Sequence, residues 1–271
     1  MQEQRTRILE LLVGWEADPA ASIHRARQAC KRARAVAQLL KVGAPYAAVV
    51  ENGFFRRIQK RLAYARDNEA LVEALDFLTE GVTEPRLAES VAMLRAALLA
   101  RAVSILQENR STLETQIDLA CQELYAAERR LSLLPLETLR RRDLRNGASR
   151  TWERCVAGFT RLGLDSPPAD FHAWRRQVKY AWHQAQLLAA IRPTGMESPL
   201  RDLSATLGHC QDLELLETLL RQQPDALRID THVQRLRQLI GVSLQNLHAL
   251  SLGLGQELFG APAPVEAVTG S

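Results

Sequence analysis

The sequence predicts an all-α protein, and three observations lead to this prediction. Long segments are rich in Ala, Leu, Arg, Gln and Glu, which favour the helical conformation. Runs of alternating β-branched residues, which are typical of strands, are missing. A helical motif that contains a histidine begins at His24 and again at His172, which indicates two related halves.

Pro and Gly separate the expected helices from one another. Pro lacks a backbone N–H and Gly has excess backbone freedom, so both residues interrupt helices. The breaks fall, in order, at "ADPAA", "VGAP", "EGVTEP", "LGLDSPPAD", "IRPTGMESP" and "QQPDA". The expected helices cover 2–16, 20–42, 46–66, 68–80, 84–108, 111–132, 136–161, 169–191, 198–222 and 226–252. We expect Asp18 and Ser198 to cap the helices that they precede, each with Pro at the first helical position.

The repeated segments predict an internal duplication. The stretch "IHRARQACKRAR" matches "FHAWRRQVKYAW", and "RRIQKRLAYARDNEALVEAL" matches "RDLSATLGHCQDLELLETLL" in the same order along the chain. The matched residues are His24 with His172, Arg27 with Arg175, Lys31 with Lys179, Arg56 with Arg201, Leu62 with Leu207 and Asp67 with Asp212. Two motifs that recur in one order are harder to attribute to chance than a single similar helix.

The duplication divides the chain into two expected helical bundles and a tail. The first bundle is expected over 1–134 and the second over 135–257, with a flexible tail of small residues and Pro over 258–271. Helices 84–108 and 111–132, the longest uninterrupted helical patterns, are expected to form an antiparallel pair.

Cysteine usage and hydropathy indicate a soluble protein of a reducing compartment. The four cysteines lie far apart and form no CxxC pair, so neither a disulfide framework nor a zinc knuckle is indicated. The first residues contain no apolar stretch of signal-peptide length, and no run of about 18 apolar residues occurs. We therefore expect a cytoplasmic protein that does not cross a membrane.

The charge pattern is more informative than the net charge of +4, which says little about partners. All but four of the 35 basic residues are Arg, whose planar guanidinium can bond two phosphate oxygens at once. The segment "SIHRARQACKRARAVAQLL" contains no acidic residue at all. At about 100° per residue its polar side chains form one stripe, which comprises His24, Arg27, Lys31 and Arg34. The matching residues of the second half are His172, Arg175, Lys179 and Trp182. Stacked cations repel one another, so a multivalent anion would stabilise the stripe.

The H-x2-R-x3-K order of both motifs, followed by "ARD" and "CQD", resembles the CHAD domain, the conserved histidine α-helical domain. The resemblance implies two pseudo-symmetric, antiparallel four-helix bundles with a basic central groove or pore that binds inorganic polyphosphate. Carried over by position, the candidate binding residues are His24, Arg27, Lys31, Arg34, Arg56, Lys60, His172, Arg175 and Lys179, with Arg25, Arg32, Arg145 and Arg201 as further candidates. The second motif departs from the family pattern, since Trp182 replaces a cation and His183 stands where Tyr is common.

We therefore expect a stand-alone, non-enzymatic polyphosphate-binding protein that needs no cofactor and associates with polyphosphate granules. The alternative is a nucleic-acid-binding helical protein that uses the same basic surface, since both ligands are contacted through phosphates. Exposed aromatic platforms would favour nucleic acid, and the aromatic residues of the basic hairpin are Tyr46, Phe54, Phe55 and Tyr64. Other polyanions are further expected partners.

Catalytic and metal sites are not expected from the sequence. A phosphatase or phosphotransferase needs a metal cluster or a Gly-rich phosphate loop, and the chain shows neither pattern. No HxxxH or HExxH spacing is present, so the histidines are expected to donate hydrogen bonds to an anion or to orient neighbouring arginines. Asp67 and Asp212 are expected to pair with Arg on a neighbouring helix.

Overall fold

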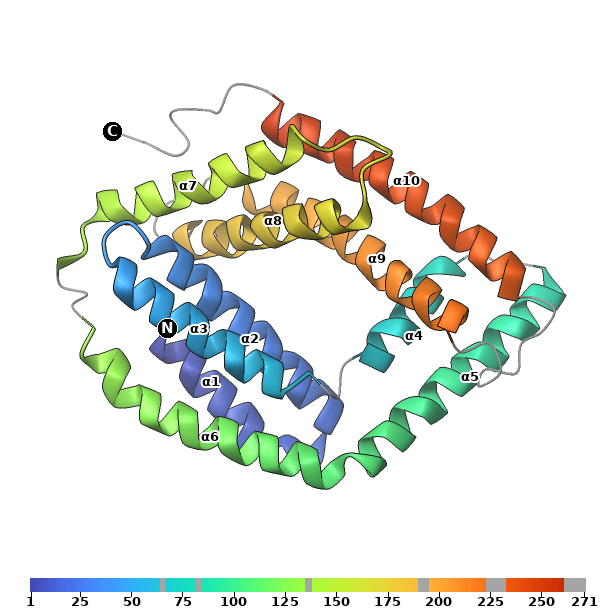
Figure 1. Cartoon of the computed structure of the whole chain (residues 1–271), viewed down its shortest axis with the longest axis horizontal. Helices are drawn as coiled ribbons and strands as arrows, with labels where there is room; N and C mark the ends of the chain where they lie inside the picture. The colour runs from blue at the N-terminus through green and yellow to red at the C-terminus, as the bar shows by residue number, and fades with distance from the viewer. Residues whose placement is uncertain (64–66, 81–83, 135–137, 190–194, 223–232, 261–271) are drawn as a thin grey trace.

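A computed structural model describes residues 1–63, 67–80, 84–134, 138–189, 195–222 and 233–260, and every regular element in these ranges is helical (Figure 1). The elements are α1 (Gln2–Val13), the short 3₁₀ helix η1 (Trp15–Ala17), α2 (Pro19–Leu39), α3 (Pro45–Arg61), α4 (Asp67–Leu78), α5 (Pro85–Glu108), α6 (Arg110–Ser132), α7 (Arg141–Phe159), α8 (Pro168–Ala189), α9 (Glu197–Gln222) and α10 (Val233–Phe259). The all-α prediction is confirmed. No described helix is long and apolar enough to cross a membrane.

Proline determines where several helices begin. The Asp18 side chain accepts a hydrogen bond from the Ala21 backbone N–H at 3.2 Å, and Pro19 follows as the first helical residue, so the predicted cap is confirmed. The matching prediction for Ser198 is wrong, because α9 already begins at Glu197. Ser198 lies inside the first turn and donates its hydroxyl to Asp202 Oδ2 at 3.4 Å instead.

One hydrophobic cluster joins α1, α2, α3 and α6. Small residues on α2 let its neighbours approach closely, and larger side chains from the other helices fill the space between them. Its buried members include Ile8, Ala26, Ala29, Ala33, Phe54, Phe55, Ile58, Leu113, Ile117 and Leu124. These helices form the N-terminal part of the molecule (Figure 1).

The described residues contain two further clusters, so the core does not divide simply at residue 134. One cluster packs α7 and α8 against parts of α9 and α10, and it includes Phe171, Trp174, Val178, Leu203 and Leu207. The other packs α4 and α5 against the remaining parts of α9 and α10, and it includes Leu75, Leu94, Leu98, Leu213 and Leu236. The helices α4 and α5 thus belong to the first half by sequence, but they pack against the second half.

The expected antiparallel pairing of α5 with α6 is wrong. Figure 1 shows the two helices diverging from their junction, with α5 leading toward α4 and α10 and α6 leading toward α1 and α3. The apolar faces explain this difference, because Leu94 and Leu98 of α5 are buried in one cluster and Leu113 and Ile117 of α6 in another. Length and helical periodicity alone do not specify which helix covers an apolar face.

The last helix extends past residue 258, where the predicted tail begins. The last helix continues to Phe259, which is buried and makes an edge-to-face contact with Trp152, with ring centroids 4.8 Å apart. The predicted tail at 258–271 therefore includes the end of α10, and residues 261–271 lie outside the described part of the chain.

The two motif helices lie side by side in the middle of the molecule (Figure 1). Gln184 of α8 donates its amide N–H to the Ala35 carbonyl of α2 at 3.1 Å, which is a buried hydrogen bond between the two halves. Gly147 of α7 lies directly against the Leu39 backbone, where any side chain would collide with main-chain atoms. These contacts hold α7 and α8 against α2 and bring the two cationic stripes together.

Candidate functional site

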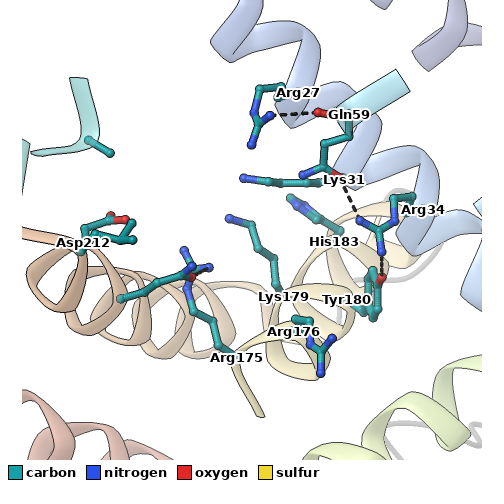
Figure 2. Close-up of a pocket in the computed structure, with 13 residues that line it drawn as sticks. Arg27, Lys31, Arg34, Gln59, Arg175, Arg176, Lys179, Tyr180, His183 and Asp212 are labelled. Carbon is teal, nitrogen blue, oxygen red and sulfur yellow. Dashed lines mark hydrogen bonds between the residues drawn. The ribbon is translucent and has the colours of Figure 1, made fainter. Parts of the chain in front are cut away.

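A cavity of about 290 Å³ lies between α2, α3, α8 and α9, and we name it the central cavity (Figure 2). The basic residues that line it come from both copies of the motif, namely Arg27, Lys31 and Arg34 from α2 and Arg175, Arg176 and Lys179 from α8. Figure 2 shows Arg27, Lys31, Arg175 and Lys179 pointing toward the same space. Asp212 is the one carboxylate among the described residues that line this cavity, so the local charge is strongly positive.

A second cavity, of about 490 Å³, adjoins the first and is named the side cavity. Both cavities share four lining residues, which are Arg175, Lys179, His183 and Asp212. The side cavity adds four predicted binding residues, which are His24, Arg25, Arg32 and Arg201. The shared lining makes one continuous cationic region on both sides of Arg175 and Lys179.

Three hydrogen bonds hold the Arg34 guanidinium at the central cavity. Its Nε donates to Asn52 Oδ1 at 3.2 Å, its Nη1 to Gln59 Oε1 at 2.8 Å and its Nη2 to the Tyr180 hydroxyl at 2.9 Å. Gln59 also accepts a hydrogen bond at its backbone carbonyl, from Arg27 Nη1 at 2.9 Å. The acceptors of Arg34 are all uncharged oxygens, so they orient its guanidinium without cancelling its charge.

Arg175 is positioned from α9. Its Nη1 donates to Gln211 Oε1 at 2.6 Å, which is again an uncharged acceptor. Gly208 lies one helical turn before Gln211 on α9, and a Cβ atom at this glycine would come within 3.4 Å of Arg175 Nη2. The glycine therefore leaves the room in which the guanidinium lies.

His183 is a buried imidazole between the two cavities. Burial, together with the positive charges of Lys179, Arg32 and Lys31, lowers its pKa to about 4, against a raising effect of its hydrogen bond with Gln186. The ring is therefore neutral at pH 7. It stacks on Trp182 with ring centroids 4.6 Å apart, which fixes its orientation.

The structure sorts the predicted binding residues into three groups: those that line one of the two cavities, those that are exposed and line neither cavity, and His172. The central cavity contains Arg27, Lys31, Arg34, Arg175 and Lys179, and the side cavity adds His24, Arg25, Arg32 and Arg201. Arg56, Lys60 and Arg145 are exposed and line neither cavity. His172 forms the third group and lines neither cavity.

The two matched histidines lie in different surroundings. His24 lines the side cavity, and its Nε2 lies 3.3 Å from Gln28 Nε2. His172 instead forms an ion pair with Glu214 of α9, and His248 of α10 lies on the other side of that carboxylate at 4.0 Å. Burial raises the pKa of Glu214, while His172 counteracts this effect. A direct contact of His172 with a ligand stays a prediction, and in this structure its side chain contacts Glu214.

Sequence reasoning missed several lining residues. Arg176 directly follows the matched Arg175, so its position beside the motif was a usable signal. The uncharged acceptors Gln59, Tyr180 and Gln211 had no such signal, because their role depends on contacts between different helices. Asp212 lines both cavities, and its predicted pairing with Arg stays a prediction. The side chain of Asp67 lies outside the described part of the structure.

Metal ligands and activated nucleophiles are the groups that would perform chemistry at such a site. Within the described ranges, no three His, Cys, Asp or Glu side chains are arranged to hold a metal ion. Burial raises the pKa of the Cys30 thiol to about 12 and that of the Cys210 thiol to about 12. These two thiols are therefore protonated at neutral pH and are poor nucleophiles.

The comparisons with known proteins agree with the motif. A family profile described as CHAD domain matches residues 1–221 of the 271-residue chain, a range that contains both motif helices and nearly all of α9. No curated protein and no solved structure matches the chain significantly. Since the matched range covers most of the sequence, the chain belongs to the CHAD domain family.

Proposed function

We propose that this protein binds inorganic polyphosphate in the central and side cavities, as a holding module and not as an enzyme. One observation is the main support for the proposal. The duplicated stripes contribute Arg27 and Lys31 from one half, and Arg175 and Lys179 from the other half, to a single cavity. Polyphosphate is a flexible chain of repeated negative charges, and it can contact cations from several helices at once.

The shape of the cationic region favours a polymeric anion over a single phosphate. The two cavities share Arg175 and Lys179 in their lining, so one extended ligand can contact both cavities and these two cations at once. Arginine suits this task, because its fork can bond two oxygens of one phosphate group. Such contacts recognise phosphate oxygens alone, which fits a ligand that has no sequence to be recognised.

The aromatic residues give less support to nucleic acid as the ligand. Phe54 and Phe55 of the basic hairpin are buried in the N-terminal cluster, so neither can stack on a base. Tyr46 is exposed at 83% but lines neither cavity, and Tyr64 lies outside the described residues. Tyr180 lies at the central cavity, where its hydroxyl accepts a hydrogen bond from Arg34.

A competition assay tests the proposal directly. Labelled long-chain polyphosphate is bound to the protein at physiological salt and displaced with unlabelled polyphosphate or single-stranded DNA. We expect polyphosphate to compete at much lower phosphate concentration than DNA, and the affinity to fall steeply with salt as counterions are released. Equal competition by DNA would favour the nucleic-acid alternative, and an affinity that does not depend on salt would overturn both.

The non-enzymatic part of the proposal has its own test. We expect the purified protein to leave polyphosphate chain length unchanged in the presence of Mg²⁺ or Mn²⁺, as measured by gel electrophoresis and phosphate release. Steady release of orthophosphate that is lost in a variant of the cationic stripe would contradict this expectation.

In the cell, such a holding module is proposed to reside in the cytoplasm at polyphosphate granules, and other polyanions are proposed as weaker ligands.

A further inference from the structure

A third concave region lies between α7 and α8, away from the α2 side of α8, and we name it the α7–α8 cleft. It has a volume of about 410 Å³. Its basic residues are Arg154 and Arg161 from α7 and the turn after it, and Arg176 from α8. The repeated motif does not include Arg154 or Arg161, so the duplication gives no reason for this cluster.

Arg176 connects the cleft with the central cavity, because its side chain lines both. In Figure 2 the guanidinium of Arg176 extends away from the space on which Arg175 and Lys179 converge. A phosphate chain that leaves the central cavity past Arg176 can therefore enter the cleft that Arg154 and Arg161 also line.

The cleft keeps a positive charge despite one carboxylate. Asp170 lines it, but in the described part of the structure it forms no ion pair with the three arginines. Three cations against one acid leave an excess that an anion can neutralise.

The floor of the cleft is rigid. Trp174 lines it and is almost fully buried, and its indole N–H donates to the Cys155 carbonyl at 3.0 Å. Gly158 of α7 lies against the same indole, where a Cβ atom would come within 2.7 Å of the ring. Because α7 and α8 are held closely together here, the helix positions that carry Arg154 and Arg176 keep a fixed spacing.

We propose that the α7–α8 cleft is a second anion-binding segment, which takes the stretch of polyphosphate that leaves the central cavity past Arg176. The inference rests on the proposed function and extends it, because it makes affinity depend on chain length. A short chain fills the central cavity alone. A long chain occupies the cleft as well and gains the contacts with Arg154 and Arg161.

The test compares two variants with the same change in net charge. The cleft variant is Arg154→Gln and Arg161→Gln, which leaves Arg176 of the central cavity unchanged. The control variant is Arg141→Gln and Arg142→Gln, which removes two exposed arginines that line none of the three cavities. Each protein is titrated with tripolyphosphate and with long-chain polyphosphate over a range of salt concentrations, and circular dichroism confirms the helical content.

We expect the cleft variant to bind tripolyphosphate within about twofold of the control and long-chain polyphosphate about tenfold more weakly. Its salt dependence for the long chain should also be shallower, by roughly 0.7 in log–log slope for each phosphate group that the cleft no longer neutralises. Equal binding of the long chain by the two variants would overturn the inference and leave the proposed function intact. Failure of the unmodified protein to bind any polyphosphate would overturn both.

Discussion

Arg34 and Arg130 are both half-buried arginines near an aromatic ring, yet they differ in what they bond. Arg34 lies at the central cavity beside Tyr180, and all of its hydrogen bonds to described residues go to uncharged oxygens. Arg130 lies at the edge of the N-terminal cluster over the Phe54 ring, and it donates to both carboxylate oxygens of Glu51 at 2.6 and 3.1 Å. The first arginine keeps its charge available to a ligand, whereas the charge of the second is cancelled.

The same contrast extends to neighbouring residues. Arg61 donates Nε and Nη2 to Glu123 Oε1 at 3.0 and 2.6 Å, so it connects α3 to α6 and adds no free charge. Arg175 donates to the amide oxygen of Gln211. The excess of Arg in the sequence therefore overstates the charge that is available for binding, because some arginines serve the fold and others face the cavities.

The largest expected effect comes from the central cavity. We expect Arg27→Glu with Lys31→Glu to weaken polyphosphate binding at least about a hundredfold, because each charge-assisted contact is worth about 1.5–3 kcal/mol. Folding should survive, since both side chains lie on the polar face of α2. Removing the bond from Arg27 to the last turn of α3 costs about 1 kcal/mol at most. Polyphosphate titrations and circular dichroism melts measure the two effects separately.

A matched control exists one helix away. Arg56→Glu with Lys60→Glu makes the same charge change at the same spacing on α3, at exposed positions that line neither cavity. We expect this control to weaken binding by less than about tenfold, through the long-range field alone. If both pairs weaken binding equally, total charge determines the affinity and the comparison between regions is wrong.

The second effect concerns the fold and not the ligand. We expect Glu51→Gln to lower the free energy of unfolding by about 2 kcal/mol, because the carboxylate is fully buried and Arg130 loses its charged partner. Since the pair lies outside both cavities, the affinity for polyphosphate should stay within about twofold at a temperature where the variant is folded. Urea unfolding and a titration in the cold test this, and a large loss of affinity with intact helical content would contradict it.

The third effect converts one kind of arginine site into the other. In Gln59→Glu, the uncharged acceptor of Arg34 becomes a carboxylate of nearly the same shape. We expect binding to weaken about tenfold while the melting temperature stays equal or rises, because a new ion pair replaces a neutral hydrogen bond. Gln211→Glu is expected to act in the same way through Arg175.

The control for these substitutions is a carboxylate at an exposed glutamine of α6, Gln122→Glu, which lines neither cavity. A purely structural role for Gln59 and Gln211 would predict lower stability together with lower affinity. Weaker binding with unchanged or higher stability distinguishes the electrostatic role from that structural one.

The parts of the fold and site that the sequence predicts depend on local signals. Asp18 and Pro19 specify a helix start through local chemistry alone. Arg27 and Lys31 meet Arg175 and Lys179 because α2 packs against α8. The packing of α4 and α5 on the second half could not be predicted, since an apolar stripe does not identify its partner. The same limit applies to His172, whose contact with Glu214 depends on how α9 lies against α8.

The smallest expected effect is a dependence on pH through His183, which lies between the two cavities. Its pKa in the folded protein is about 4, against about 6.5 in an unfolded chain. Between these values the unfolded state binds more protons, so the contribution of this residue to stability is complete above about pH 6.5 and is lost as the pH falls toward about 4.

A bound polyanion would favour the protonated ring and raise this pKa, so binding should strengthen several-fold between about pH 7 and pH 5. We expect His183→Gln to reduce both trends. Melting temperatures and titrations with long-chain polyphosphate across this pH range measure the two trends. If the variant keeps the full pH dependence of the unmodified protein, His183 is not the group that titrates on binding.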